Sequence, residues 1–444
     1  MSSAPVHEMD TPAMETWPAW QRVVFRFFFV YLLLQIAPWN MFAPLPGVPA
    51  LLGVIEAGIS WAVQFGNREL FHVRDTLIPP NGSGDTSFAW AQLWLYLTVA
   101  LATCAVWTIA DRKRGAYVTL RYWLHLIVRY YIAAAALGYG VIKIFGLQMG
   151  FPTTSQLATP LGDLLPMRFS WLFIGYSPTY QIFSGIAETV AGLLLLFRPT
   201  ITAGLFVATG AFLNVVLINL SYDVPVKLYS SHLLLACLFL LAADAPRVFN
   251  FLILNRATPA THAYDFVLSR PWQMWGARAV KLFVVYNMLV APVVGGYQRV
   301  QAARQPAVPG PFRTGVYEVR EFAVNGVAVP SSPGDSMRWK DVIFDSNGAG
   351  SVGTADAFFQ RRYGRGYFRY KADTARRTAS VWKTSAIPGD STFLFTLRYE
   401  VPDTNVLRFS ARIRADSVHV ELVRRERHFP LAERQFHWLS EYNR

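Results

Sequence analysis

The sequence is dominated by long apolar runs that end near residue 300. Several of them approach the length of about 20 residues with which a helix crosses the roughly 30 Å hydrocarbon core of a bilayer. Only 16% of the 444 residues are charged and 53% are hydrophobic, whereas a soluble domain carries roughly 25% charge. The chain is therefore expected to be a multi-span α-helical membrane bundle, with the lipid bilayer as its first partner.

The formal net charge of +13 does not indicate nucleic-acid binding. Its arginines are interleaved through loops and a β-rich tail and form no compact basic patch. Basic loops that control topology are the better interpretation. The run Asp111-Arg112-Lys113-Arg114 and the segment from Arg256 to Lys281 both fall on the side expected to face the cytoplasm.

These loops predict about seven spans, with a cytoplasmic N-terminus and an exported C-terminal part. The run PALLGVIEAGISWAVQF, which Glu56 interrupts, is expected to lie at the outer interface as an amphipathic helix. The predicted segments are a cytoplasmic stretch 1–22, two spans with the interfacial helix 23–123, a membrane core 124–250, and an inner loop with the last span 251–296.

After residue 296 the pattern changes. Residues 297–312, with Pro306, Pro309 and Pro311, are predicted to be a linker. Residues 313–444 contain short alternating runs separated by turn residues, including the hairpin dipeptide Asn325-Gly326. We expect an antiparallel β-barrel or sandwich, with a lipocalin-like meander as the first choice.

Ionisable side chains interrupt the apolar runs of the predicted core. Lys143 lies near the end of one run and Glu188 in the middle of the next. Gln181, Ser184 and Glu188 recur at three-to-four spacing and share a helix face. An ionisable residue in a span costs about 2.5–3.5 kcal/mol and therefore usually faces a partner or a cavity.

The predicted topology places these polar groups toward one outward-facing pocket. Glu188 and Lys143 are the candidate catalytic residues, Glu188 as a proton relay and Lys143 as a ligand of a quinone-like head group. His232 is an alternative hydrogen-bond donor to that head group. The other predicted pocket residues are Tyr139, Gln148, Gln181, Ser184, Asn214, Asn219, Tyr222, Asp223 and Lys227.

The same residues also allow a purely structural interpretation. A Lys143–Glu188 or Asp223–Lys227 ion pair, together with asparagine clamps, would fix helix packing without any chemistry. Cys104 and Cys237 stand alone in apolar runs, so buried thiols are favoured over a single bridge between them. No metal-ligand spacing is present, and no metal site is predicted.

The closing segment ERQFHWLSEYNR is rich in aromatic and charged residues. We expect it to fold back, either as a plug in the barrel or as a segment that docks on the membrane face.

The region from Gly138 to Asp244 resembles the membrane part of large bacterial DoxX-family proteins. The matching residues are Lys143, Gly175-Tyr176-Ser177, Gly185 with Glu188, Arg198-Pro199-Thr200, Asn219 and Tyr222-Asp223-Val224-Pro225-Val226-Lys227, and the final FHWLSEYNR is similar to the end of such proteins. The resemblance implies a four-helix core in a bacterial inner membrane, with the C-terminal domain in the periplasm. Some of these proteins are linked to quinone-dependent sulfur oxidation or to thiol-redox complexes, but paired cysteines are lacking here.

Two functions follow from this. The first is a quinone-linked oxidoreductase, or a subunit that works with other membrane redox proteins and uses a quinone as its cofactor. The second is a non-enzymatic scaffold or assembly protein whose exported β-domain binds a partner.

Overall fold

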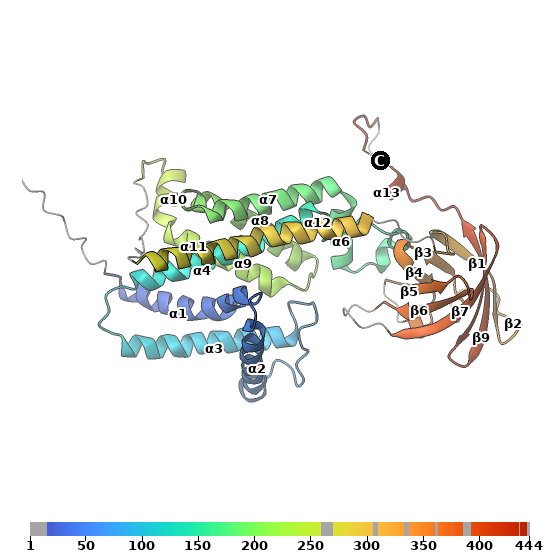
Figure 1. The fold of residues 1–444 in the computed structure, drawn as a ribbon, viewed down its shortest axis with the longest axis horizontal. Helices are drawn as coiled ribbons and strands as arrows, with labels where there is room; N and C mark the ends of the chain where they lie inside the picture. The colour runs from blue at the N-terminus through green and yellow to red at the C-terminus, as the bar shows by residue number, and fades with distance from the viewer. Residues whose placement is uncertain are drawn as a thin grey trace, which may run out of the picture. The chain divides into compact units, whose positions relative to one another are not determined.

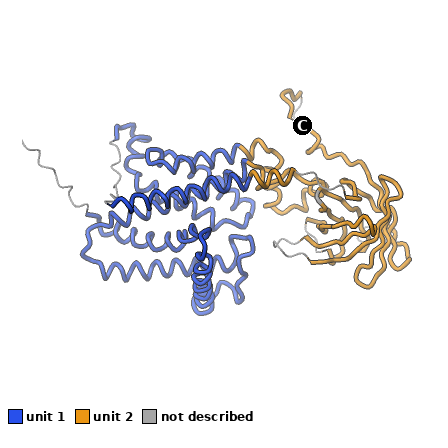
Figure 2. The backbone as a smooth tube through the Cα atoms, viewed as in Figure 1, with its two compact units in different colours: residues 1–144, 183–296 blue, residues 145–182, 297–444 orange. Residues whose placement is uncertain are grey.

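The fold comes from a computed structural model that describes residues 16–258, 270–304, 310–332, 337–359, 363–384, 392–434 and 436–441. The chain forms two compact units (Figure 2). The helical unit contains residues 1–144 and 183–296, and the barrel unit contains residues 145–182 and 297–444. Residues 145–182, which the sequence assigns to the membrane core, thus belong to the barrel unit.

Seven described helical segments are long and apolar enough to cross a membrane, which confirms a multi-pass membrane protein. They are Ala19–Phe42 (α1, Ala19–Ile36, and the turn after it), Val48–Phe71 (α2, Val48–Gly66, and its extension), α3 (Ser87–Ala110), α4 (Val118–Ile144), α7 (Pro178–Leu196), Arg198–Ser221 (ending in α8, Ile201–Ser221) and Pro271–Arg304 (α11, Pro271–Val285, through α12, Ala291–Arg304). Helix α9 (Lys227–Ala243) is followed by α10 (Ala245–Leu252) after a bend of 77°.

Helix α2 lies across the bundle. It runs down the page in Figure 1, whereas α1, α3, α4 and α9 run across it. Leu51, Val54 and Trp61 are exposed on one side of α2, and the helix with its extension is also long and apolar enough to cross a membrane. That α2 lies at the interface stays a prediction.

The helical core is built around α4. Leu124, Val128, Ile132 and Ala136 recur every four residues and are fully buried, which is the face that a helical repeat presents to its neighbours. Cys104 and Cys237 are both buried free thiols, as the sequence predicts. The helix α11–α12 continues to Arg304, so the linker begins later than residue 297. Residues 305–309 of the predicted linker lie outside the described part of the chain.

The C-terminal part is a closed antiparallel barrel of eight strands in meander order. The strands are β1 (Gly315–Val324), β3 (Asp341–Phe344), β4 (Ala349–Gly353), β5 (Gly366–Asp373), β6 (Thr378–Lys383), β7 (Phe393–Asp403), β8 (Val406–Ile413) and β9 (Asp416–Arg425). Pairing of β1 with β9 closes the barrel. Asn325 and Gly326, both at positive φ, turn β1 into the short β2 (Val327–Ala328), which confirms the predicted hairpin.

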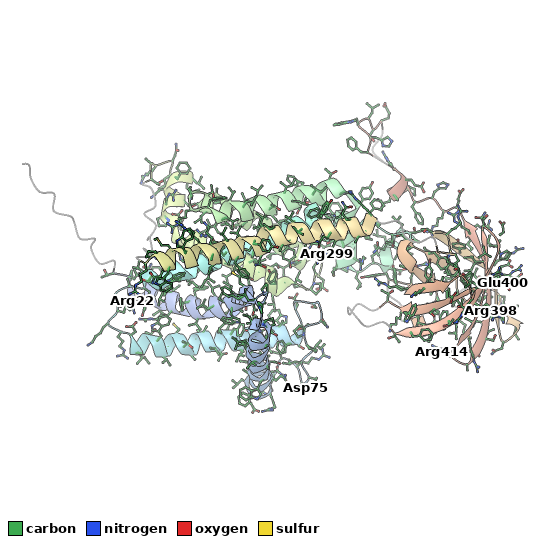
Figure 3. The ribbon with its side chains drawn as sticks, viewed as in Figure 1. Arg22, Asp75, Arg299, Arg398, Glu400 and Arg414 are labelled. Atoms are coloured by element: carbon green, nitrogen blue, oxygen red, sulfur yellow. The ribbon has the colours of Figure 1, made fainter. Side chains whose placement is uncertain are left out.

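Alternation along each strand separates the two faces of the barrel wall. On β7, Phe395, Leu397 and Tyr399 are buried, while Arg398 and Glu400 point outward (Figure 3). Phe312, from the end of the predicted linker, enters the barrel and lies 4.8 Å from Phe344 between ring centroids.

The barrel interior is therefore full. Its residual cavity of about 20 Å³, lined by aromatic and aliphatic side chains, is about the size of one water molecule. Phe436, Trp438 and Leu439 of the tail are exposed. The prediction that the tail plugs the barrel is thus wrong, because side chains of the wall and Phe312 already occupy the space.

The part of the segment 145–182 around Ser155 is fastened to the outside of the barrel wall. The insert contains α5 (Thr154–Leu157) and α6 (Pro166–Tyr176). The Ser155 backbone N–H donates to Asp345 Oδ1 at 3.0 Å, and Ser351 Oγ–H donates to Ser155 Oγ at 2.8 Å. Arg365 donates to Ser351 Oγ at 2.7 Å and to Asp341 at 2.5 Å. Because Ser155, Asp345, Ser351 and Arg365 are buried, solvent does not readily replace the bonds among them, and these bonds hold the insert in one position.

Candidate functional site

Lys143 and Glu188 form a buried ion pair between α4 and α7. Lys143 Nζ donates to Glu188 Oε1, and the two side chains are 9% and 3% exposed. The second carboxylate oxygen of Glu188, Oε2, has no hydrogen-bond partner among the described residues. The ion pair that the structural interpretation requires is therefore present in the structure.

Two glycines bring α4 and α7 close enough for the pair to form. A Cβ on Gly140 would lie 2.7 Å from the Gly185 carbonyl oxygen, and a Cβ on Gly185 would lie 2.7 Å from the Gly140 carbonyl oxygen. No side chain fits in such a contact. The backbones therefore touch beside Lys143 and Glu188, and neither residue lines the hollows described below.

Gln181 fixes the entrance of α7 instead of lining a pocket. It is 2% exposed, its Nε2 donates to the Met149 carbonyl at 2.8 Å, and its Oε1 accepts the Met149 N–H at 3.0 Å. Ser184 is half-buried on the same helix. The buried Oε1 of Gln148 has no partner among the described residues.

Some of the polar residues predicted on α8 and at its end are exposed, and one is buried. Asn214 is exposed on α8 and lines neither of the hollows described below. Asn219 is buried and donates to Ser230 Oγ at 2.9 Å, so it clamps α8 to α9. Tyr222 is partly exposed at the end of α8.

Asp223 and Lys227 belong to the start of α9. Lys227 Nζ donates to Asp223 Oδ1 at 2.8 Å, and the Asp223 side chain is 83% exposed. The backbone N–H groups of Lys227 and Leu228 both donate to the Asp85 carboxylate at 2.9 Å. Asp85 thus caps the N-terminus of α9. The sequence did not single out Asp85, although it follows the turn-rich segment PPNGSG.

His232 lies in a different environment from the ion pair. Its Nδ1 is 2.6 Å from the Leu228 carbonyl oxygen and its Nε2 is 2.5 Å from the Tyr31 hydroxyl. A carbonyl only accepts hydrogen bonds, so Nδ1 carries the proton and Nε2 accepts from Tyr31. Tyr139 is 37% exposed, and its ring centroid is 6.2 Å from that of Tyr229.

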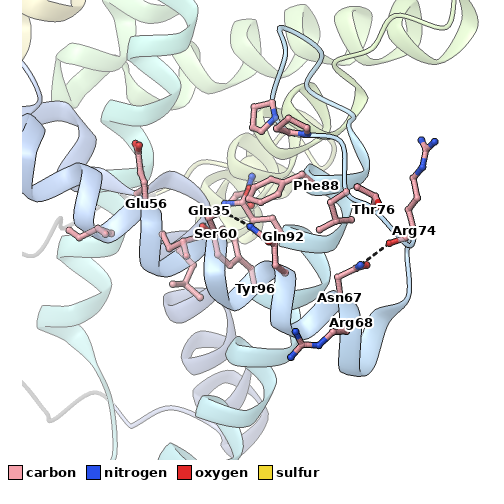
Figure 4. A pocket seen from close by; sticks show the side chains of 18 of the residues that line it. Gln35, Glu56, Ser60, Asn67, Arg68, Arg74, Thr76, Phe88, Gln92 and Tyr96 are labelled. Atoms are coloured by element: carbon pink, nitrogen blue, oxygen red, sulfur yellow. Dashed lines mark hydrogen bonds between the residues drawn. The ribbon is translucent and has the colours of Figure 1, made fainter.

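Two adjoining hollows open in the helical unit beside these residues. The larger, of about 1110 Å³, lies between α1, α2 and α3 (Figure 4). The smaller, of about 370 Å³, is lined by Tyr139, Tyr229 and His232. Gln35 and Gln92 line both hollows. Of the residues predicted for the pocket, the structure brings Tyr139 and His232 together here.

Polar and charged side chains line the larger hollow, whereas the smaller hollow combines neutral polar groups with apolar surface. Glu56, Ser60 and Gln64 recur every four residues along α2 and line the larger hollow. The Gln92 amide donates to the Tyr96 hydroxyl at 2.8 Å (Figure 4). In the smaller hollow, carboxamides, hydroxyls and an imidazole beside apolar walls suit a ligand with a compact, uncharged polar head.

Gln35 and Gln92 were missed from the sequence. Each is an amide in an otherwise apolar run, YLLLQIAP and FAWAQLWLY, and that is the signal that could have identified them.

Comparison with known proteins reveals one relationship. No family model matches the chain, and no solved structure matches it. A stretch of 116 residues, 26% of the chain, is 33% identical to the uncharacterized protein YwoB of Bacillus subtilis and covers 73% of that protein. The chain belongs to the YwoB family. YwoB is described as uncharacterized, so the relationship brings no activity with it.

Proposed function

We propose that the protein binds the head group of a quinone in the two adjoining hollows and acts as a quinone-linked oxidoreductase or as a subunit of a membrane redox complex. The supporting observation is that Tyr139 and His232 line one hollow, with Gln35 and Gln92 shared between both. A quinone has two carbonyl acceptors on a flat apolar ring, and the hollow offers hydroxyl and amide donors beside tyrosine rings.

Different residues of the hollows would make different contacts with the bound quinone. Tyr139 and the amides of Gln35 and Gln92 would donate to carbonyl oxygens. The His232 Nδ1–H is already bonded to Leu228, so the imidazole would act through the Tyr31 hydroxyl on its other nitrogen. A bound quinone would supply two-electron chemistry coupled to proton uptake. The Tyr31–His232 chain could hold a proton beside it.

The resemblance to DoxX-family proteins supports the same class of function and a bacterial inner membrane. We place the barrel on the periplasmic side as part of this proposal, from the basic loops of the sequence. Lys143 and Glu188 do not line the hollows. In this proposal, residues of the hollows therefore take the roles of head-group ligand and proton relay that the sequence assigned to that pair.

Co-purification tests the proposal. The full chain would be extracted in mild detergent, and its lipids analysed by mass spectrometry. We expect a quinone in the natural chain and its loss in the variants Gln92→Leu and Tyr139→Phe. The matched control is the Lys143→Met/Glu188→Leu double variant, which should retain it. A natural chain that carries no quinone, and whose unfolding is not shifted by an added short-chain quinone, would refute the proposal.

A second candidate function is that of a scaffold or assembly protein. It is favoured by the filled barrel, which leaves no room for a small ligand, and by the Lys143–Glu188 pair, which locks two helices. A protein partner that co-purifies through the outer wall of the barrel, in the absence of any quinone, would support this candidate over the first.

A further inference from the structure

The C-terminal tail carries an unusual density of exposed apolar side chains. Phe436, Trp438 and Leu439 are 77%, 94% and 77% exposed. The rings of Phe436 and Trp438 meet edge to face, 5.0 Å between centroids. Large apolar groups so close together rarely remain in water without a partner.

A second apolar strip lies on α6. Leu165, Phe169 and Phe173 recur every four residues and are all exposed, so they form one stripe along the helix. The opposite side of α6 is packed, with Ser170 and Gly175 buried. The stripe continues onto α7, because the Phe173 and Tyr180 ring centroids are 6.1 Å apart.

The covalent chain places this stripe at a membrane boundary. Helix α6 ends at Tyr176, and α7, a candidate span, begins at Pro178, so one residue separates them. The exposed surface of α7 continues as Phe183, Ile186 and Val190, which are side chains suited to lipid. Aromatic side chains gather at such boundaries, where one end of the ring is in apolar surroundings and the other in water.

A hydrogen bond brings the tail to the same place. The Tyr176 hydroxyl donates to the Arg434 carbonyl oxygen at 3.4 Å. Trp438 is four residues further along, so an extended chain can carry it at most about 14 Å from Arg434. The tail is therefore held next to the end of α6 at which the span begins.

We propose that the tail residues Phe436, Trp438 and Leu439, together with the α6 stripe, form a membrane-docking surface that inserts into the head-group region of the bilayer in which the helices are embedded. The occupant of this surface is lipid. The barrel unit is then held to the membrane at its C-terminus as well as through its connections to the spans.

Site-directed fluorescence in vesicles tests the proposal on the full chain. Both native cysteines are buried, so an introduced cysteine is the preferred site for an NBD label. Three labelled variants, Leu439→Cys, Phe173→Cys and Glu400→Cys, would be reconstituted into vesicles of phosphatidylethanolamine and phosphatidylglycerol. Glu400, on the outer wall of the barrel (Figure 3), serves as the matched exposed control.

A nitroxide-bearing lipid head group and aqueous iodide would then be compared as quenchers. The nitroxide lipid should quench the labels at Leu439 and Phe173 at least about twofold more than the label at Glu400, and adding Phe436→Ser and Trp438→Ser should remove this excess at Leu439 only. If iodide quenches the Leu439 label as strongly as the Glu400 label, the tail lies in water and the proposal is wrong. It is equally wrong if neither agent quenches at Leu439, because the tail is then covered by protein. Neither result depends on quinone binding.

Discussion

Replacing Lys143 by methionine should strongly destabilise the helical unit. The Lys143 ammonium is the partner of Glu188 Oε1, and Oε2 has no partner among the described residues. The substitution therefore leaves a carboxylate that is 3% exposed without any partner. Removing one member of a buried ion pair costs about 3–5 kcal/mol.

The double variant separates a broken pair from a lost side chain. Lys143→Met/Glu188→Leu removes both charges and keeps apolar volume, a change that is often neutral or stabilising by about 1–4 kcal/mol. We expect its free energy of unfolding to lie within about 1 kcal/mol of the natural chain or above it. Glu188→Leu alone should be destabilising, because it leaves a buried ammonium.

Unfolding by SDS in mixed micelles, followed by circular dichroism, measures these differences. Asp223, whose side chain is 83% exposed beside Lys227, provides the control, and Asp223→Asn should change stability by about 0–1 kcal/mol. The reasoning is refuted if Lys143→Met matches the natural chain, or if the double variant is as unstable as the two single variants.

Three further outcomes are expected. Gly140→Ala should lower the free energy of unfolding by about 1–3 kcal/mol, because its Cβ would lie 2.7 Å from the Gly185 carbonyl oxygen. Gly138→Ala is the control: its Cβ would meet nothing within 4 Å, and it should stabilise α4 by up to about 1 kcal/mol. Equal effects of the two variants in the SDS titration would contradict this. Burial raises the pKa of Tyr367 above 10.0, so the contribution of its neutral form to stability is complete below pH 10.0 and is lost as the pH rises through the folded-state pKa. The melting temperature of the full chain should therefore fall over that pH range, and it should fall less for Tyr367→Phe. Deleting residues 435–444 should leave the melting of the barrel unchanged, since the described residues of that segment are exposed; a clear drop in melting temperature would show that the tail packs on the wall.

Some features of this fold were predictable because they depend on local patterns. Residues close together in the sequence determine whether an apolar run of bilayer length forms a spanning helix, and whether alternating residues with an Asn-Gly turn form a hairpin. The helical bundle and the meander barrel could be predicted on this basis. The buried thiols Cys104 and Cys237 followed in the same way from the runs that contain them.

The candidate site was harder to predict because its residues come from distant parts of the chain. Tyr31 and His232 are 201 positions apart, and Ser155 and Asp345 are 190 positions apart. Nothing in the spacing of Lys143 and Glu188 indicated that glycines would close the helices around them. Gln35 and Gln92 line the same hollows only because α1 and α3 lie side by side in the fold.

The sequence alone determined which segments leave water, since transfer of apolar surface depends on composition and short-range periodicity. The tertiary structure decided which polar groups meet. Packing placed Lys143 against Glu188 in a closed contact, left Tyr139 and His232 at a hollow, and moved residues 145–182 onto the barrel wall. Such pairings depend on the shapes of surfaces that are far apart in the chain, and only the folded protein brings those surfaces together.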